Sequence, residues 1–242
     1  MPFIQWIDEQ DAEGEVAEGY QMYFDRRPDR PQVAEIIKCF SHRPDFMKHV
    51  LEFSWKVHFR DGHLPERVKE MIATLVSGQN RCPYCMNSHA YFLHMHGADN
   101  TVVAALGRGE IENAQVTEPE QALLRFTRLL TIEPHRNTAQ EVQLLRDCGW
   151  SDPQIAEAVY IAAMFAFFNR VANGFGLDDP KYFESNGSAN PLEGFLPSFS
   201  GLSSGTMSST LSSTDHDDSD SGADKSGLRT ERPSPRSRRS VE

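Results

Sequence analysis

Two cysteines three residues apart, followed four residues later by a histidine, are the side chains of this sequence best suited to chemistry. Cys82, Cys85 and His89 form the pattern C-x-x-C-x-x-x-H. In a reducing compartment the C-x-x-C spacing indicates redox chemistry or metal binding more often than a structural disulfide. The other two cysteines, Cys39 and Cys148, lie among apolar helical neighbours, and we expect them to be inert thiols.

Pro83, directly after Cys82, predicts a helix that begins at this point with Cys82 as its N-cap. Cys85 then lies in the first turn, where free amides and the helix dipole favour a thiolate and lower the pKa of the thiol. Because four residues separate Cys85 from His89, their side chains share one face of the helix. Cys82 and Cys85 are close enough to form a disulfide after a small adjustment.

Glu70 joins this group only if the chain reverses between Glu70 and the cysteines. On an unbroken helix it would lie about 18 Å from Cys82. The sequence Gly78-Gln79-Asn80 interrupts the helical pattern, and a reversal near residue 80 makes the two helices an antiparallel hairpin. We therefore expect the Glu70 carboxylate to face the His89 imidazole, with the two thiols beyond it.

Two other interpretations of this pattern stay open. Two cysteines, His89 and Glu70 could complete a tetrahedral zinc site. The motif could also be an inherited but inactive feature of a scaffold protein. Thiol exchange is favoured over zinc because a proline lies between the cysteines at a helix start and because the sequence has no second C-x-x-C.

The elements that position these residues are predicted to be helical throughout residues 1–185. Apolar residues recur there at intervals of three and four and almost nowhere alternate at two. The clearest segments are PDRPQVAEIIKCF, RPDFMKHVLEFSWKVHF, LPERVKEMIATLVSG, PEQALLRFTRLLTI, TAQEVQLLRDCG and SDPQIAEAVYIAAMFAFFNRVANGFG. The last begins at a capped start and is apolar on nearly all sides, so we expect it in the middle of the bundle.

A weak internal similarity suggests a duplicated helical hairpin. One segment begins at Pro65 and ends in SGQNR, and another begins at Pro153 and ends in FFNR; only the first is followed by cysteines. Asn169 and Arg170 are the polar residues of the second segment. Burial of Arg170 would require a partner, and a structural role is favoured over substrate binding.

The composition changes near residue 186. Residues 186–242 are dominated by Ser, Gly, Pro and charge, which predicts a disordered tail, and the segment ends in the basic cluster RTERPSPRSRRS. The whole chain carries a net charge of −11, so nucleic acid is not expected as a partner. The longest apolar run is well short of the about 20 residues that a membrane span requires, and the chain opens with no signal segment. We expect a cytoplasmic protein without a membrane partner.

The run E-x11-C-x-x-C-x3-H, formed by Glu70, Cys82, Cys85 and His89, resembles the signature of the alkylhydroperoxidase AhpD-like branch of the carboxymuconolactone decarboxylase superfamily. The flanking segments around it are similar to those of the peroxidase-related members, and the likeness covers about residues 1–185. The resemblance implies an all-α, AhpD-like helical bundle, a symmetric homo-oligomer and thiol-dependent reduction of peroxides.

The resemblance also implies roles for the four residues: Cys85 as the peroxidatic thiol, Cys82 as the resolving thiol, and Glu70 with His89 as the proton relay. One departure is Tyr84, because some members have a histidine directly before the second cysteine. An external dithiol reductant, a thioredoxin-like or lipoyl-bearing protein, would restore the thiols. No cofactor is expected, since the sequence has no glycine-rich phosphate loop. The alternatives are a redox switch or disulfide oxidoreductase without efficient peroxidase turnover and, ranked lower, a lyase of the decarboxylase type.

Overall fold

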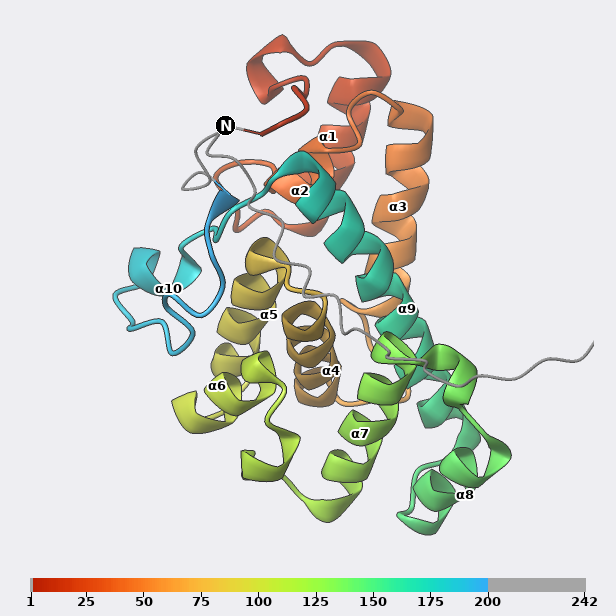
Figure 1. Cartoon of the computed structure of the whole chain (residues 1–242). Helices are drawn as coiled ribbons and strands as arrows, with labels where there is room; N and C mark the ends of the chain where they lie inside the picture. Colours follow the sequence, from red (N-terminus) through yellow and green to blue (C-terminus); the bar gives the residue numbers. More distant parts are fainter. Residues whose placement is uncertain (1, 200–242) are drawn as a thin grey trace, which may run out of the picture. The chain divides into compact units, whose positions relative to one another are not determined.

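The computed structural model describes residues 2–199, and the regular secondary structure of this part of the chain is helical, with no strand. The all-α prediction is confirmed. Figure 1 shows the order and packing of the elements. They are η1 (Glu9–Asp11), α1 (Gly14–Arg26), α2 (Glu35–Lys38), α3 (Pro44–Val57), α4 (Glu66–Gln79), α5 (Pro83–Met95), α6 (Asn100–Arg108), η2 (Ile111–Asn113), α7 (Glu118–Ile132), η3 (Pro134–Arg136), α8 (Ala139–Asp147), α9 (Asp152–Phe175) and α10 (Tyr182–Ser185).

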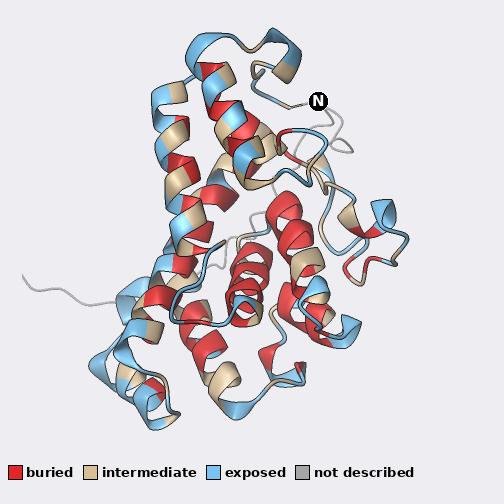
Figure 2. Cartoon of the chain, turned by 180° about the vertical axis from the view of Figure 1, so that it is seen from behind, coloured by how far each residue is buried: buried red, intermediate tan, exposed pale blue. Residues whose placement is uncertain are grey.

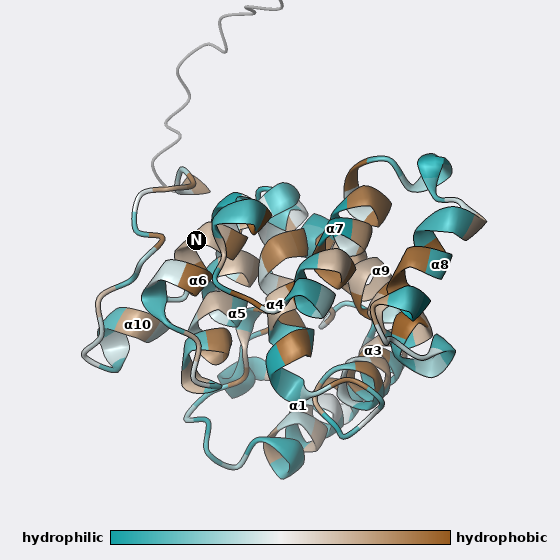
Figure 3. Ribbon diagram, turned by 90° about the horizontal axis from the view of Figure 1, so that it is seen from below, coloured by the Kyte–Doolittle hydropathy of each residue, from teal (hydrophilic) through white to brown (hydrophobic). Residues whose placement is uncertain are grey.

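Helix α4 is the centre of the bundle. Every residue from Val68 to Gly78 is buried, and the helix packs against α5, α6, α7 and α9 (Figures 2 and 3). A helix buried on all sides cannot show a simple apolar stripe, and polar residues on it must find partners inside the protein. Glu70 and its neighbour Lys69 are two such residues.

The α4–α5 hairpin forms at the predicted place. Helix α4 ends at Gln79, Arg81 adopts a left-handed conformation with φ of 51°, and Cys82 is the N-cap of α5 with Pro83 in its first turn. The sequence suggested that the helix is interrupted from Gly78 onward, but Gly78 lies inside α4. A Cβ atom at Gly78 would lie 2.0 Å from the carbonyl oxygen of Gly107, so this glycine allows α4 and α6 to approach closely.

Helix α9 is the long core helix that the sequence predicted. A capping box of Ser151 and Gln154 starts it, and Gly176, with φ of 71°, ends it. The helix runs unbroken through Asn169 and Arg170, so the suggested second hairpin is not formed there. By length and composition α9 could cross a membrane, but 56% of the tested window is buried inside the protein, which is also typical of a core helix in a soluble protein.

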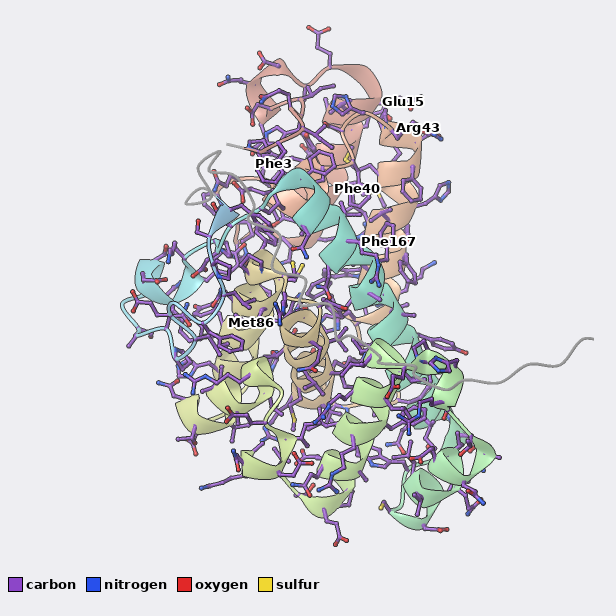
Figure 4. All side chains as sticks on the ribbon, in the orientation of Figure 1. Phe3, Glu15, Phe40, Arg43, Met86 and Phe167 are labelled. Carbon is purple, nitrogen blue, oxygen red and sulfur yellow. The ribbon has the colours of Figure 1, made fainter. Side chains whose placement is uncertain are left out.

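The amino-terminal part of the described chain covers α9 from one side. Helices α1 and α3 pack together, and the short α2 contacts α9. Phe40 stacks on Phe167 of α9 with ring centroids 6.0 Å apart, and both rings are labelled in Figure 4. This layer forms one wall of the cavity described below.

Residues 186–199, which the sequence assigned to a disordered tail, are described and contact the bundle. Leu192 is 1% exposed and packs against Gly107, where a Cβ atom would lie 2.5 Å from the Leu192 side chain. Asn190 donates to the Asn87 side chain over 2.9 Å. Isolated apolar residues can therefore dock onto a preformed surface even where the local composition is polar. The rest of the predicted tail, including its basic cluster, lies outside the described residues.

Candidate active site

The hairpin brings Glu70 of α4 and His89 of α5 into contact. Oε2 of Glu70 is 2.7 Å from Nδ1 of His89, and both side chains are buried. The two residues lie on opposite sides of the turn at nearly equal distances along the chain, so an antiparallel pairing aligns them. The predicted contact between carboxylate and imidazole is confirmed.

A second imidazole, which the sequence analysis did not select, contacts the same carboxylate. His58, the residue after α3, places its Nε2 2.9 Å from Oε1 of Glu70 and is 3% exposed. Its Nδ1 has no hydrogen-bond partner among the described residues. The only signal in the sequence was a histidine at the end of an apolar helical segment, which is a common feature of protein cores. The contact between His58 and Glu70 depends on how the α3 end packs against the α4–α5 hairpin, which the local sequence does not specify.

The two imidazoles decide the charge of Glu70. Burial opposes ionisation of this carboxyl, but the facing rings of His58 and His89 and their hydrogen bonds outweigh burial and lower the pKa of Glu70 to about 2. Burial has the opposite outcome at His58, where it lowers the pKa of the imidazole despite the adjacent carboxylate. Glu70 is thus an anion next to a neutral His58.

This charge state fixes the tautomer of each ring. An ionised carboxylate only accepts hydrogen bonds, so Nε2–H of His58 and Nδ1–H of His89 both donate to Glu70.

Cys82 and Cys85 lie at the start of α5 as predicted, but the electrostatics of Cys85 differ from the prediction. The backbone N–H of Cys85 donates to Sγ of Cys82 over 3.4 Å. Burial, together with a hydrogen bond to the Cys82 thiol, raises the pKa of Cys85 well above its usual value. The predicted acidic thiolate is therefore wrong for this structure: a helix amino terminus stabilises an anion by at most about 2 kcal/mol, and loss of hydration outweighs it here.

A buried amide network packs beside the thiols. Asn169 of α9 contacts the Cys85 thiol and acts on its pKa in the lowering direction. The same amide donates to Ser77 over 3.0 Å and accepts from Asn80 over 2.9 Å, so it is held in place from α4 and from the hairpin turn. Arg170, in contrast, is exposed and donates to a carbonyl of its own helix. The buried polar residue of α9 is Asn169, and the expected buried arginine is not observed.

Cys85 and His89 both line a cavity with about 110 Å³ of open volume. Its wall is mostly apolar and aromatic, with Trp55 and Phe59 from the α3 side and Phe165 from α9. Cys82 is not part of this wall and is fully buried. A small molecule in the cavity would meet the thiol of Cys85 and the imidazole of His89 first.

Tyr84 occupies the position where some members of the resembled family have a histidine. The residue is buried, lines the same cavity, and burial raises its pKa well above the usual value, so it remains a neutral phenol. In this chain the second imidazole of the site comes from His58, directly after α3.

One group in the described residues has the composition of a metal site, namely His58, Glu70 and His89, whose ligand atoms lie within 4.8 Å of one another. The cysteines are not part of this group, so the zinc site considered from the sequence does not match the arrangement. The two nitrogen–oxygen distances, 2.7 and 2.9 Å, are those of hydrogen bonds that share protons with the carboxylate. These contacts are compatible with proton transfer through the cluster.

Comparison with known proteins shows what this chain is similar to. The carboxymuconolactone decarboxylase family model matches residues 44–126. No curated protein matches the sequence. Among solved structures, an uncharacterized peroxidase-related protein with an alkylhydroperoxidase AhpD core from Ralstonia eutropha JMP134 superposes with a TM-score of 0.64 and 22% identity, covering 73% of this chain and 94% of that one.

Two further structures extend the comparison. An uncharacterized peroxidase-related protein from Silicibacter sp. TM1040 gives a TM-score of 0.65 at 20% identity, covering 75% of this chain and 97% of the other. A variant of the debrominase Bmp8, in complex with 2,3,4-tribromopyrrole, gives 0.58 at 18% identity and covers 72% and 89%. The fold is thus found in proteins with different names and activities. Residues 44–126 match the carboxymuconolactone decarboxylase family model, and the described helices have a fold similar to that of AhpD-like, peroxidase-related proteins.

Proposed function

We propose that this chain is a thiol-dependent peroxidase with Cys85 as the nucleophile, Cys82 as the resolving thiol, and Glu70 and His89 as the proton relay. The observation that supports it best is a single arrangement: Cys85 and His89 line one cavity, and Glu70 accepts a hydrogen bond from Nδ1 of His89. A cavity that reaches a thiol and a base suits a small substrate.

The first half of the reaction oxidises Cys85. Because burial raises the pKa of Cys85, the thiol needs a base, and Nε2 of His89 accepts its proton. The thiolate attacks the terminal oxygen of the peroxide and the O–O bond breaks. The leaving alkoxide takes the proton back from His89 and departs as an alcohol, and Cys85 is left as a sulfenic acid.

The second half forms the disulfide. Sγ of Cys82 attacks the sulfenic sulfur and water is released, so one peroxide and two thiols give one alcohol, one water and one disulfide. An external dithiol must then reduce the disulfide. Since Cys82 is fully buried and Cys85 is 4% exposed, a slender dithiol such as a lipoyl arm would reach them more easily than the surface of a thioredoxin-like protein.

The test is consumption of an organic hydroperoxide with dihydrolipoamide as donor. We expect Cys85→Ser to abolish turnover, and Cys82→Ser to permit one round that ends in a sulfenic acid trapped by dimedone. Cys148→Ser, at a partly exposed cysteine outside the cavity, is the matched control and should keep wild-type activity. Equal activity in all four proteins would refute the proposal.

Mass spectrometry of the peptide from Cys82 to His89 gives an independent measurement. After one equivalent of peroxide the peptide should lose two hydrogens. A redox switch would form the same disulfide but turn over very slowly and retain a partner only when oxidised. A lyase would keep its activity in both cysteine variants.

The debrominase among the structural neighbours suggests one further arm of the assay. That debrominase variant forms a complex with 2,3,4-tribromopyrrole, and the cavity of this chain is lined by aromatic rings. Incubation with tribromopyrrole and dihydrolipoamide would detect bromide release. The peroxidase proposal requires that hydroperoxide be the better substrate.

A homo-oligomer in the reducing cytoplasm would fit this chemistry. Light scattering on the purified full chain measures the subunit number, and fractionation of the producing cells tests the location.

A further inference from the structure

One side of the cavity is cationic. Arg26, at the end of α1, and Arg27 and Arg30, in the turn that follows, line the cavity together with Cys85 and His89. The chain as a whole carries a net charge of −11, so three arginines at one cavity are a local departure from the average. Their ion pairs decide whether this charge is already neutralised.

Arg26 shares its carboxylate with another cation. Nη2 of Arg26 pairs with Glu52 of α3, and Nζ of Lys56 lies 3.5 Å from the other oxygen of Glu52. The guanidinium of Arg26 lies 5.8 Å from the centre of the Trp55 ring, which also lines the cavity. Nη1 of Arg26 is buried and has no hydrogen-bond partner among the described residues.

The second pair of arginines also shares one carboxylate. Arg27 binds both oxygens of Asp29, each at 3.1 Å, and Nε of Arg30 is 3.5 Å from one of them. Nε of Arg30 is buried without a hydrogen bond in the described chain. The Arg30 guanidinium lies 5.5 Å from the ring centre of Phe92 and 5.0 Å from that of Tyr182. These rings hold the planar guanidinium group in place beside the cavity.

The balance on this side is four cationic groups to two carboxylates. Two carboxylates among four cations leave a net positive charge on this side, which would attract an anion into the cavity. The remaining wall is apolar and aromatic. A fitting ligand therefore has an apolar body, an anionic group for the arginines and a reactive group that reaches Cys85.

We propose that the cavity selects small aromatic or branched organic acids, bound as carboxylates on the side of Arg26 and Arg30. The inference rests on the proposed peroxidase function and names its substrate class: a carboxylated organic hydroperoxide in place of a neutral one. A carboxylate suits the edge of a guanidinium because the two groups match in a planar, bidentate geometry.

Binding separates this inference from the chemistry. The probes are the two unreactive alcohols that correspond to cumene hydroperoxide and to its 4-carboxylated analogue, titrated into the full chain by calorimetry at pH 7. We expect the carboxylated alcohol to bind about tenfold more tightly or better, and Arg30→Gln and Arg26→Gln each to lose most of this preference. The matched control is Arg125→Gln on α7, which removes one exposed cation outside the cavity and should keep the preference.

Salt provides a measurement that does not depend on a variant. Raising the ionic strength should weaken binding of the carboxylated alcohol and leave the neutral alcohol unchanged. Equal binding of the two alcohols by the wild-type chain would overturn the inference while turnover of the neutral hydroperoxide upholds the peroxidase. Preference for the carboxylate without turnover of either hydroperoxide would uphold the binding class and overturn the peroxidase.

Discussion

Two buried carboxylates of this bundle have different partners. Glu70 on α4 accepts hydrogen bonds from two imidazoles. Glu157 on α9 lies 2.6 Å from the ammonium of Lys69, and its other oxygen accepts the backbone N–H groups of His63 and Leu64 over 2.5 and 2.8 Å. Both carboxylates are ionised in the folded protein, because their partners lower each pKa against the effect of burial.

The difference lies in what the partners can do. Ammonium groups and backbone amides ordinarily keep one protonation state near neutral pH, whereas an imidazole can gain or lose a proton there. Glu157 is therefore a structural clamp that holds the segment between α3 and α4. A Cβ atom at Gly62 would lie 2.0 Å from the carboxylate, so a larger residue at this position would force the Glu157 carboxylate to shift. That segment follows directly on His58, so the clamp indirectly positions one imidazole of the site.

The largest effect is expected at the clamp. Glu157→Gln leaves the Lys69 ammonium buried without a counterion, and we expect a loss of about 3–5 kcal/mol in the free energy of unfolding, measured by urea denaturation. The double variant Lys69→Met with Glu157→Leu should recover much of this loss, because no buried charge remains. If Glu157→Gln were as stable as wild type, Glu157 would not be the structural clamp that distinguishes it from Glu70.

At Glu70 we expect a smaller effect, mainly on catalytic activity and less on stability. Glu70→Gln removes the anion that fixes the His89 tautomer, and kcat/KM for hydroperoxide should fall about 100-fold. Its loss of stability should be smaller than that of the Glu157 variant, since the amide can still hydrogen-bond to the rings. Glu66→Gln, one turn earlier on α4 and exposed, is the control. Unchanged kinetics in Glu70→Gln would exclude the relay.

His58 is expected to contribute less. His58→Phe removes one donor to Glu70 but leaves His89 paired, so we expect about a tenfold fall in kcat. Without that imidazole the pKa of Glu70 rises, and the acidic limb of the pH–rate profile should move to higher pH. The exposed His49→Phe serves as control. An unmoved acidic limb would mean that His58 only fills space.

The smallest effect is a pH dependence of stability. The pKa of Glu70 is lowered from 4.5 to about 2 on folding, so the unfolded chain binds more protons between these values and stability falls as the pH drops. The lowered pKa of His58 acts in the same direction below its usual value of 6.5. From pH 6 to pH 3.5 the Glu70 contribution is on the order of 1 kcal/mol. Urea titrations of Glu70→Gln should show a flatter slope; an equal slope would contradict the assignment.

Much of the site could be predicted because it is local in the sequence. Pro83 after Cys82 specifies a helix start, and the equal distances of Glu70 and His89 from the turn align them across a hairpin. These relations depend only on helix geometry and on one reversal of the chain. The helical period likewise predicted α3, α4, α7, α8 and α9.

Other features depended on packing. His58 reaches Glu70 because α3 packs against the hairpin, and Asn169 reaches Cys85 from α9. No rule of residue spacing predicts either contact, because the contacts join separate helical segments. The pKa of Cys85 also depends on packing. The helix start favours a thiolate, but the surrounding helices exclude the water that would solvate it, and the pKa rises. The sequence by itself determined which groups are present and how neighbours on one hairpin align. Only the tertiary structure decided which groups are buried from solvent, because the segments that cover each group are distant along the chain.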